Sequence, residues 1–133
     1  MNFKRYYIGL VLLLSVIGLN AENRPATVFM YGFAASFNDS TVYFTPIQQM
    51  DSAFVDSKTD FLYGRADYSY QLRDYLERTG FPNATCITSF AMTRKEAEKK
   101  YLKLRKKYLD RGNYSIKYIK ETDFTYQPVK VEN

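Results

Sequence analysis

Residues 84–120 read ATCITSFAMTRKEAEKKYLKLRKKYLDRGNYSIKYIK, and this stretch decides the fold. Its first eight residues, 84–91, are mostly apolar or β-branched and predict a buried strand. A charged segment with helical spacing follows, and residues 113–120 alternate in a way that predicts a second strand. The helix between them is long enough to connect two parallel strands. We therefore expect a strand–helix–strand unit.

The helix of this unit has clear start and stop signals. Thr93 and Glu96 have the spacing of a capping box, and Gly112 suits the position just after the last turn. Four side chains fall within about 60° of one another at 100° per residue and predict one stripe facing the core. They are Ala97, Tyr101, Leu104 and Tyr108.

Two further strands are predicted upstream. Residues 27–37 alternate between large aromatic and smaller side chains, and residues 40–47 are rich in β-branched and aromatic ones. Asn38 and Asp39 between them tolerate turn geometry, so the two runs predict a β-hairpin. Pro46 cannot donate to a strand ladder and marks the end of the second strand or an exposed edge.

The middle of the chain predicts a connector and a helix. Residues 48–63 have no clean period, and we expect a packed connector with at most a short strand at residues 53–55. Residues 64–79 have apolar side chains three and four apart, which predicts an amphipathic helix. Gly80 and Pro82 end it.

The resulting order is β-β-α-β-α-β. It predicts an α+β fold, a two-layer α/β sandwich of about four strands with two helices on one face of the sheet. Residues 124–126 extend or follow the last strand, and we expect residues 128–133 to be loose.

The N-terminus has the pattern of a secretory signal peptide at residues 1–21. Lys4 and Arg5 precede an apolar run at residues 8–19, and Ala21 supplies a small residue at the cleavage position. The run has about 12 residues, whereas a spanning helix needs about 20. A segment retained as a membrane anchor is the alternative. Cleavage near Ala21 predicts a periplasmic or secreted protein.

The charge of the chain is concentrated in one place. The 133 residues hold 19 Lys or Arg and 14 Asp or Glu, and cleavage lowers the net charge from +5 to +3. We expect residues 22–133 to form a single small domain. Residues 94–111 carry a net charge of +6, whereas residues 22–93 carry −3. The predicted second helix is therefore a basic element on an acidic body.

This basic helix is the candidate binding site. Its candidate residues are Lys95, Lys99, Lys103, Lys106 and Lys107. A face of this kind suits an acidic protein, an anionic glycan or a lipid headgroup, and the alternative is a solvated face without a partner. Nucleic acid is not an expected partner of an exported protein. Leu102 and Leu109 beside the core stripe either widen the buried face or touch a partner.

The composition gives little support to an enzyme. The chain has no His, the commonest general base and a common zinc ligand, and one Cys, which excludes an internal disulfide. Asp51, Asp56 and Asp60 leave a small carboxylate-dependent hydrolase as a remote alternative. We expect no cofactor and no metal, and we prefer a non-enzymatic interaction module.

Tyrosine and cysteine are the other residue types that could form a site. The chain has 13 tyrosines, mostly at positions that suggest core packing. Tyr63, Tyr68 and Tyr70 around the start of the first helix are the candidates for a glycan- or peptide-binding surface. Cys86 lies in a strand-like run and predicts a buried, inert thiol.

The segments at residues 85–118 and 31–45, the latter reading YGFAASFNDSTVYFT, resemble a group of small exported proteins of the Bacteroidota. The resemblance covers about half of the chain after residue 21 and implies a Gram-negative cell envelope. No activity is assigned to that group, so the resemblance implies no catalytic residue.

Overall fold

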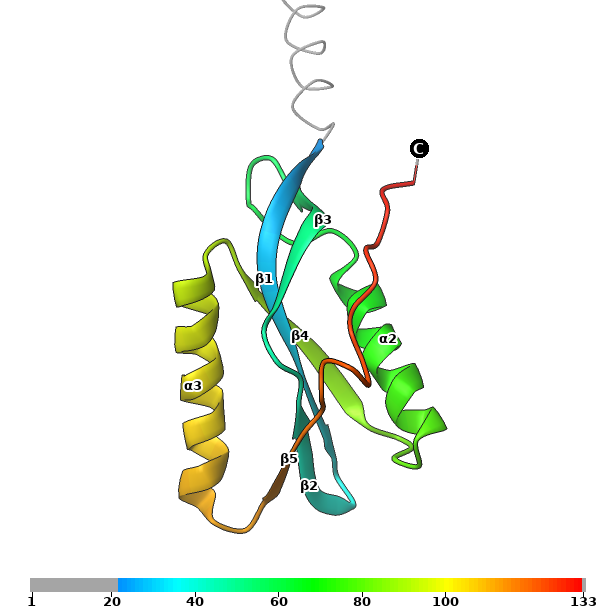
Figure 1. Ribbon diagram of the computed structural model, residues 1–133, viewed down its shortest axis with the longest axis vertical. Helices are drawn as coiled ribbons and strands as arrows, with labels where there is room; N and C mark the ends of the chain where they lie inside the picture. The colour runs from blue at the N-terminus through cyan, green and yellow to red at the C-terminus, as the bar shows by residue number, and fades with distance from the viewer. Residues whose placement is uncertain (1–21, 133) are drawn as a thin grey trace, which may run out of the picture.

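The computed structural model describes residues 22–132, in which three successive strands are followed by two helices interleaved with the last two strands (Figure 1). The elements are β1 (Asn23–Ser36), β2 (Asp39–Phe44), β3 (Gln48–Asp56), α2 (Arg65–Arg78), β4 (Thr85–Ala91), α3 (Arg94–Arg111) and β5 (Ser115–Tyr118). The predicted α+β class with two helices is confirmed. The predicted signal peptide, residues 1–21, lies outside the described residues.

The sheet has five strands, and the prediction of about four was wrong in the segment assigned as a connector. β3 buries Met50, Ala53 and Val55, which are not evenly spaced by two. The register between β1 and β3 shifts between Ala26 and Val28. A bulge of this kind breaks the alternation on which the sequence signal for a strand depends.

β1 is the central strand and pairs with three others. Phe29 and Met30 pair with both β3 and β4, while Phe33 and Ala34 pair with both β2 and β4. Because a strand has two edges, β4 must occupy one edge, and β2 and β3 must follow each other along the other. Pro46 separates β2 from β3, as expected of a residue that ends a strand.

The sheet is mixed. β1 is antiparallel to β2, β3 and β4, whereas β5 runs parallel to β2 on the edge away from β1. It follows that β4 and β5 are parallel to each other and that α3 crosses over the two strands between them. This is the predicted strand–helix–strand unit, whose two strands are separated in the sheet by the β1–β2 hairpin.

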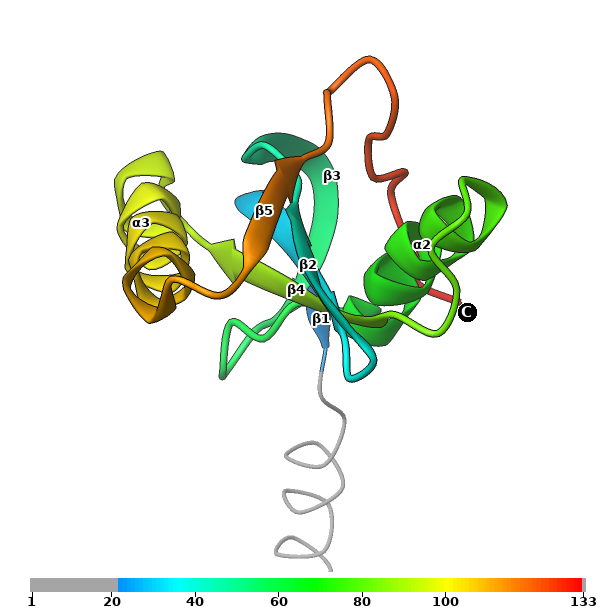
Figure 2. The ribbon, with the colours of Figure 1, turned by 90° about the horizontal axis from the view of Figure 1, so that it is seen from below.

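The two helices lie on opposite faces of the sheet, which corrects the expectation that they share one face (Figure 2). Val28, Met30 and Ala34 of β1 belong to a core cluster with Leu72 and Leu76 of α2. Odd-numbered residues of β1 point the other way, where they pack against α3. This second cluster includes Tyr31, Phe33, Val42 and Phe44, with Tyr101, Leu104 and Tyr108 packed against it.

The physical reason lies in the composition of β1. Its large aromatic side chains and its smaller ones both form surfaces that exclude water, so both faces can be covered. Aromatic rings fill the α3 side, where Tyr31 lies 5.1 Å from Tyr101 and Phe33 lies 4.9 Å from Tyr108, measured between centroids. Small residues on the other side let α2 approach closely. The alternation in the sequence shows that β1 has one face of large residues and one face of small residues. The predicted two-layer sandwich places helices on only one of these faces.

The C-terminal segment is bound to the α2 side from Phe124 onward. Within the stretch expected to be loose, residues 128–133, the structure holds Val129, whereas Glu132 N makes only a long bond of 3.5 Å to the Tyr63 hydroxyl. The Gln48 side chain donates to Tyr126 O at 2.9 Å and accepts from Tyr126 N at 2.8 Å. Gln71 forms the same pair of bonds with the backbone of Gln127, at 3.0 and 2.8 Å. Val129 N donates to the Tyr68 hydroxyl. These bonds replace a strand ladder for this segment.

Within residues 22–132, no helix is both long enough and apolar enough to cross a membrane.

Candidate functional site

α3 is fixed at both ends by the residues that the sequence indicated. The Thr93 hydroxyl accepts from Glu96 N at 3.2 Å, and Gly112 adopts a left-handed conformation with φ of 73°. Only Gly takes this conformation without steric cost. The helix lies along one flank of the molecule, away from α2 and the C-terminal segment (Figure 1). Its outer side is therefore open to solvent over its whole length.

The five candidate lysines all lie exposed on α3, and together they form what we call the lysine face. Its residues are Lys95, Lys99, Lys103, Lys106 and Lys107. Within residues 22–132, none of these ammonium groups has a hydrogen bond or an ion pair. No acidic group of residues 22–132 forms an ion pair with this face, although Glu96 and Asp110 lie exposed on the same side of α3.

The other cations of α3 contact aromatic rings or a backbone carbonyl. The guanidinium groups of Arg94, Arg105 and Arg111 lie over aromatic rings, 5.0 to 5.9 Å from the ring centroids. Lys100 donates to Phe90 O at 2.8 Å. Arginine suits ring stacking because its guanidinium is planar and weakly hydrated. The helix thus divides its cations into an anchored set and a free set.

Two leucines lie exposed next to the lysine face. Leu102 is 56% exposed and Leu109 is 52% exposed, so they do not widen the buried stripe. At 100° per residue they fall within about 80° of Lys95, Lys99 and Lys106. The solvent-exposed side of α3 therefore carries both apolar side chains and unpaired cations, separately from the buried stripe of the helix.

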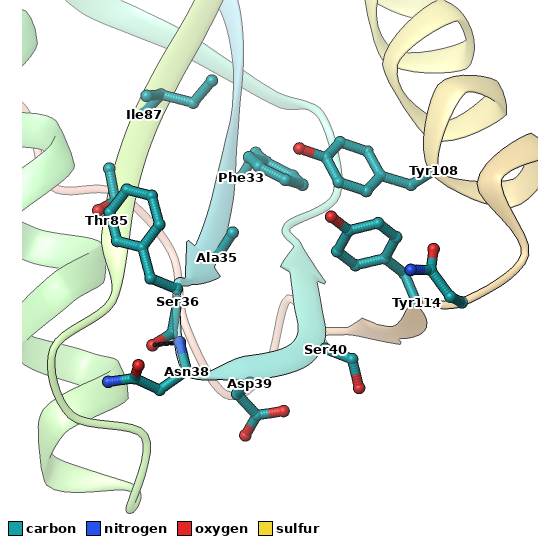
Figure 3. Close-up of a pocket in the computed structure, with 12 residues that line it drawn as sticks. Phe33, Ala35, Ser36, Asn38, Asp39, Ser40, Thr85, Ile87, Tyr108 and Tyr114 are labelled. Carbon is teal, nitrogen blue, oxygen red and sulfur yellow. Dashed lines mark hydrogen bonds between the residues drawn. The ribbon is translucent and has the colours of Figure 1, made fainter.

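A groove lies where α3 ends, between the helix and the β1–β2 hairpin (Figure 3). We call it the aromatic groove; it holds about 610 Å³. It is lined by Phe33, Ala35, Ser36, Phe37, Asn38, Asp39, Ser40, Thr85, Ile87, Tyr108, Asn113 and Tyr114. Figure 3 shows Tyr108 and Tyr114 with their hydroxyl ends directed toward the space beside Phe33 and Ala35. Its size is in the range of small-molecule sites.

Sequence reasoning missed the aromatic groove because four separate segments contribute to it. The alternation places Phe37 at the end of a strand, whereas it lies in the turn and is fully exposed. The one signal available in the sequence was an aromatic residue next to Asn38 and Asp39, at a position where turns favour Gly, Asn or Asp.

Of the three tyrosines predicted to form a surface at the start of the first helix, the structure buries one. Tyr68 is completely buried, and its hydroxyl accepts from Val129 N. Tyr70 is half exposed, with Arg73 stacked 4.7 Å from its ring centroid. Tyr63 accepts a long bond from Glu132 N. These three rings are used within the fold.

The three aspartates of the remote hydrolase alternative are engaged separately. Asp60 pairs with Arg24 at 2.6 Å, and Asp51 accepts from Thr27 and Gln49. Asp56 accepts from the backbone N–H groups of the turn that follows it, and these bonds lower its pKa. Within residues 22–132, no three His, Cys, Asp or Glu side chains are placed to hold a metal ion.

Cys86 is partly buried in β4 on the α2 side. Burial raises the pKa of its thiol from 9.0 to about 11. The thiolate is the reactive form of cysteine, so a thiol with this pKa is a poor nucleophile near neutral pH. This agrees with the prediction of an inert thiol.

No family model, curated protein or solved structure matches this chain.

Proposed function

We propose that the chain is an exported, non-enzymatic protein of the bacterial cell envelope that docks on an anionic lipid surface through the lysine face of α3. The observation that carries this proposal is the set of five exposed lysines without acidic partners among residues 22–132, next to two half-exposed leucines. Acidic lipid headgroups attract such lysines, and the leucines can enter the apolar layer beneath them.

The leucines favour a lipid surface over an anionic glycan. A glycan offers no continuous apolar layer to Leu102 and Leu109. Lysine stems can lie along apolar surface while their ammonium groups stay in the headgroup layer. A bilayer interface thus satisfies both kinds of side chain on this face.

The size of the effect can be estimated. Each lysine near an anionic surface contributes about 1 kcal/mol, and burying the exposed half of each leucine adds about 1 kcal/mol. The three lysines within about 80° of both leucines, together with the two leucines, contribute about 5 kcal/mol, which corresponds to a dissociation constant of about 0.2 mM. This is peripheral, reversible binding that salt should weaken, because salt screens exposed charges.

The acidic body supports a defined orientation. Residues 22–93 carry a net charge of −3, and α3 carries +6. A protein with separated charges turns its positive side to a negative surface. Since α3 lies on one flank, the sheet and α2 would then face away from the lipid.

The test is vesicle co-sedimentation with phosphatidylcholine alone and with phosphatidylcholine containing phosphatidylglycerol, at low and high salt. We expect binding only to the anionic vesicles and at low salt. Lys95→Glu, Lys99→Glu and Lys106→Glu together should abolish it. The matched control is Lys117→Glu, Lys120→Glu and Lys130→Glu, which changes the net charge equally but leaves α3 intact.

Two results would contradict the proposal. One is equal binding to neutral and anionic vesicles. The other is an equal loss in the control triple variant, which would mean that overall charge and not the lysine face is responsible. Binding to polyglutamate or heparin without vesicle binding would instead assign the lysine face to an acidic protein or a glycan.

A further inference from the structure

Phe37 is the most exposed large apolar side chain of the described residues, at 100%. It lies in the two-residue turn that joins Ser36 to Asp39. A turn in this position needs no aromatic side chain. Phe37 is not an isolated apolar side chain, because Ile87, which is 46% exposed, lines the same groove, and contiguous exposed apolar surface marks an interaction site.

The aromatic groove lies next to this turn, and Phe37 stands on its rim. Phe33 packs 4.9 Å from Tyr108, which in turn meets Tyr114 edge to face at 4.8 Å and 82°. Aromatic rings favour further edge-to-face or offset neighbours. The groove is therefore suited to receive one more aromatic ring.

Charged groups of opposite sign lie on the two sides of the groove, although Asp39 is the only charged residue among the described residues that line it and Arg111 lies behind Tyr108. Asp39 lies on the hairpin wall, where its carboxylate accepts from Thr41 N at 2.8 Å. Arg111, at the end of α3, lies 5.4 Å from the ring centroid of Tyr108 on the opposite wall. A hairpin tip that carries a carboxylate would fit against a helix end that carries a guanidinium group.

We propose that two copies of the chain associate about a twofold axis, with Phe37 of each copy entering the aromatic groove of the other. A twofold interface needs one surface that carries both the projection and the cavity. Phe37 and the groove meet that requirement. The exchange would also bring the hairpin that carries Asp39 toward the helix end that carries Arg111, so that opposite charges would approach each other.

The free edge of β4 is a poorer candidate for self-association. Arg65 donates to Thr88 O and Lys100 donates to Phe90 O, both at 2.8 Å. Charged side chains at these carbonyls obstruct the addition of another strand. The hairpin end is thus the favoured contact.

The dimer should be weak. A phenylalanine buries about 200 Å², so two rings and the groove walls that receive them bury about 800 Å² in total. Stable interfaces bury about 1,200 Å² or more. We therefore expect a monomer at low micromolar concentration and dimers in the high micromolar range.

Sedimentation equilibrium over a concentration series up to the millimolar range tests this. Phe37→Ser should weaken the dimer at least tenfold. The matched control is Phe61→Ser, because Phe61 is also highly exposed, at 70%, but does not line the groove. A wild-type protein that stays monomeric throughout the series overturns the proposal, as does an equal loss with Phe61→Ser.

A charge exchange tests the twofold geometry itself. Asp39→Lys and Arg111→Glu should each prevent self-association, because each puts like charges opposite one another. An equimolar mixture of the two variants should form dimers again, since every facing pair is then of opposite sign. Circular dichroism checks that both variants fold. A mixture of folded variants that stays monomeric would show that Asp39 and Arg111 do not meet across the interface.

Discussion

Gly32 is the residue at which α2, the C-terminal segment and the sheet come closest together. A Cβ atom at this position would overlap the Tyr126 hydroxyl and lie 2.7 Å from Leu72 Cδ2. Gly32 also donates to the Thr45 hydroxyl at 2.7 Å and accepts from Thr45 N at 3.0 Å. Glycine is thus required here by space, not by backbone conformation.

We predict that Gly32→Ala lowers the free energy of unfolding by about 2 kcal/mol, the usual cost of overpacking a core. Tyr126→Phe removes one of the two atoms in conflict. Urea unfolding of the single and double variants should therefore show that Gly32→Ala costs at least about 1 kcal/mol less in the Tyr126→Phe background than in the wild-type background. Purely additive effects, within about 0.5 kcal/mol, would mean that the hydroxyl is not the obstacle.

Cys86 gives a prediction on reactivity and pH. With its pKa raised to about 11, the folded protein at pH 8 holds roughly a hundredfold less thiolate than an ordinary cysteine. Alkylation by iodoacetamide should be slower in native protein than in urea by about this factor. A native rate equal to the unfolded rate at pH 8 would contradict this.

The same shift predicts that stability falls as pH rises from about 9 to 11. In this window the unfolded chain releases the thiol proton while the folded chain keeps it, so ionisation favours unfolding. Burial raises the pKa of Tyr126 as well, which acts in the same direction. Cys86→Ala should make the pH dependence of urea unfolding shallower over this range.

At the scale of elements, the C-terminal segment is the least expected part of the fold. Phe124 packs 5.3 Å from Tyr75 and 5.1 Å from Tyr126, and Tyr126 is almost fully buried. Gln48 and Gln71 supply its hydrogen bonds from β3 and α2. This segment therefore covers the side of the sheet that a helix alone leaves open.

We predict that truncation after Asp123 destabilises the protein by at least about 4 kcal/mol, since two packed aromatic residues are lost. The readouts are the urea midpoint and hydrogen exchange of α2. Truncation after Val131 is the control, because the hydrogen bond that it removes among the described residues is the long one from Glu132 N to the Tyr63 hydroxyl. Equal stability of the two truncated forms would show that the segment contributes nothing.

Elements with local signals could be predicted from the sequence. The limits of α3 follow from Thr93 and Gly112, and the β1–β2 hairpin follows from alternation and turn residues. The strand β3 was not predicted because a bulge interrupts its alternation of buried and exposed residues. The bound C-terminal segment was not predicted because hydrogen bonds to side-chain amides take the place of pairing with a neighbouring strand. Interactions between distant parts of a chain leave no local period.

The same distinction applies to the candidate site. Exposure of Lys95, Lys99, Lys103 and Lys106 followed from helical spacing alone, whereas spacing placed Lys107 beside the core stripe; all five are exposed in the structure. The aromatic groove depends on how α3, β4 and the hairpin meet, which spacing along one element does not contain. Whether Leu102 and Leu109 are buried or exposed depends on how the C-terminal half of α3 packs, and the structure shows them half exposed.

At the scale of the whole molecule, α3 serves two surfaces at once. Its outer side carries the lysine face, and Tyr108 on its inner side forms one wall of the aromatic groove. The two surfaces share a helix but no residue. If both proposals hold, a dimer on the lipid would present two lysine faces, and linked binding sites raise overall affinity without any new contact.

This arrangement predicts that the two interactions separate by concentration. Well below the dimer dissociation constant, Phe37→Ser should bind anionic vesicles as the wild type does, because only monomers are present. Near that constant, the wild type should bind several-fold more tightly than Phe37→Ser, and the lysine triple variant should still dimerise in the absence of lipid. Vesicle co-sedimentation at two protein concentrations measures the first two effects, and sedimentation equilibrium measures the third. Loss of vesicle binding by Phe37→Ser at the low concentration would mean instead that Phe37 itself enters the lipid, and the hairpin end would then belong to the membrane surface.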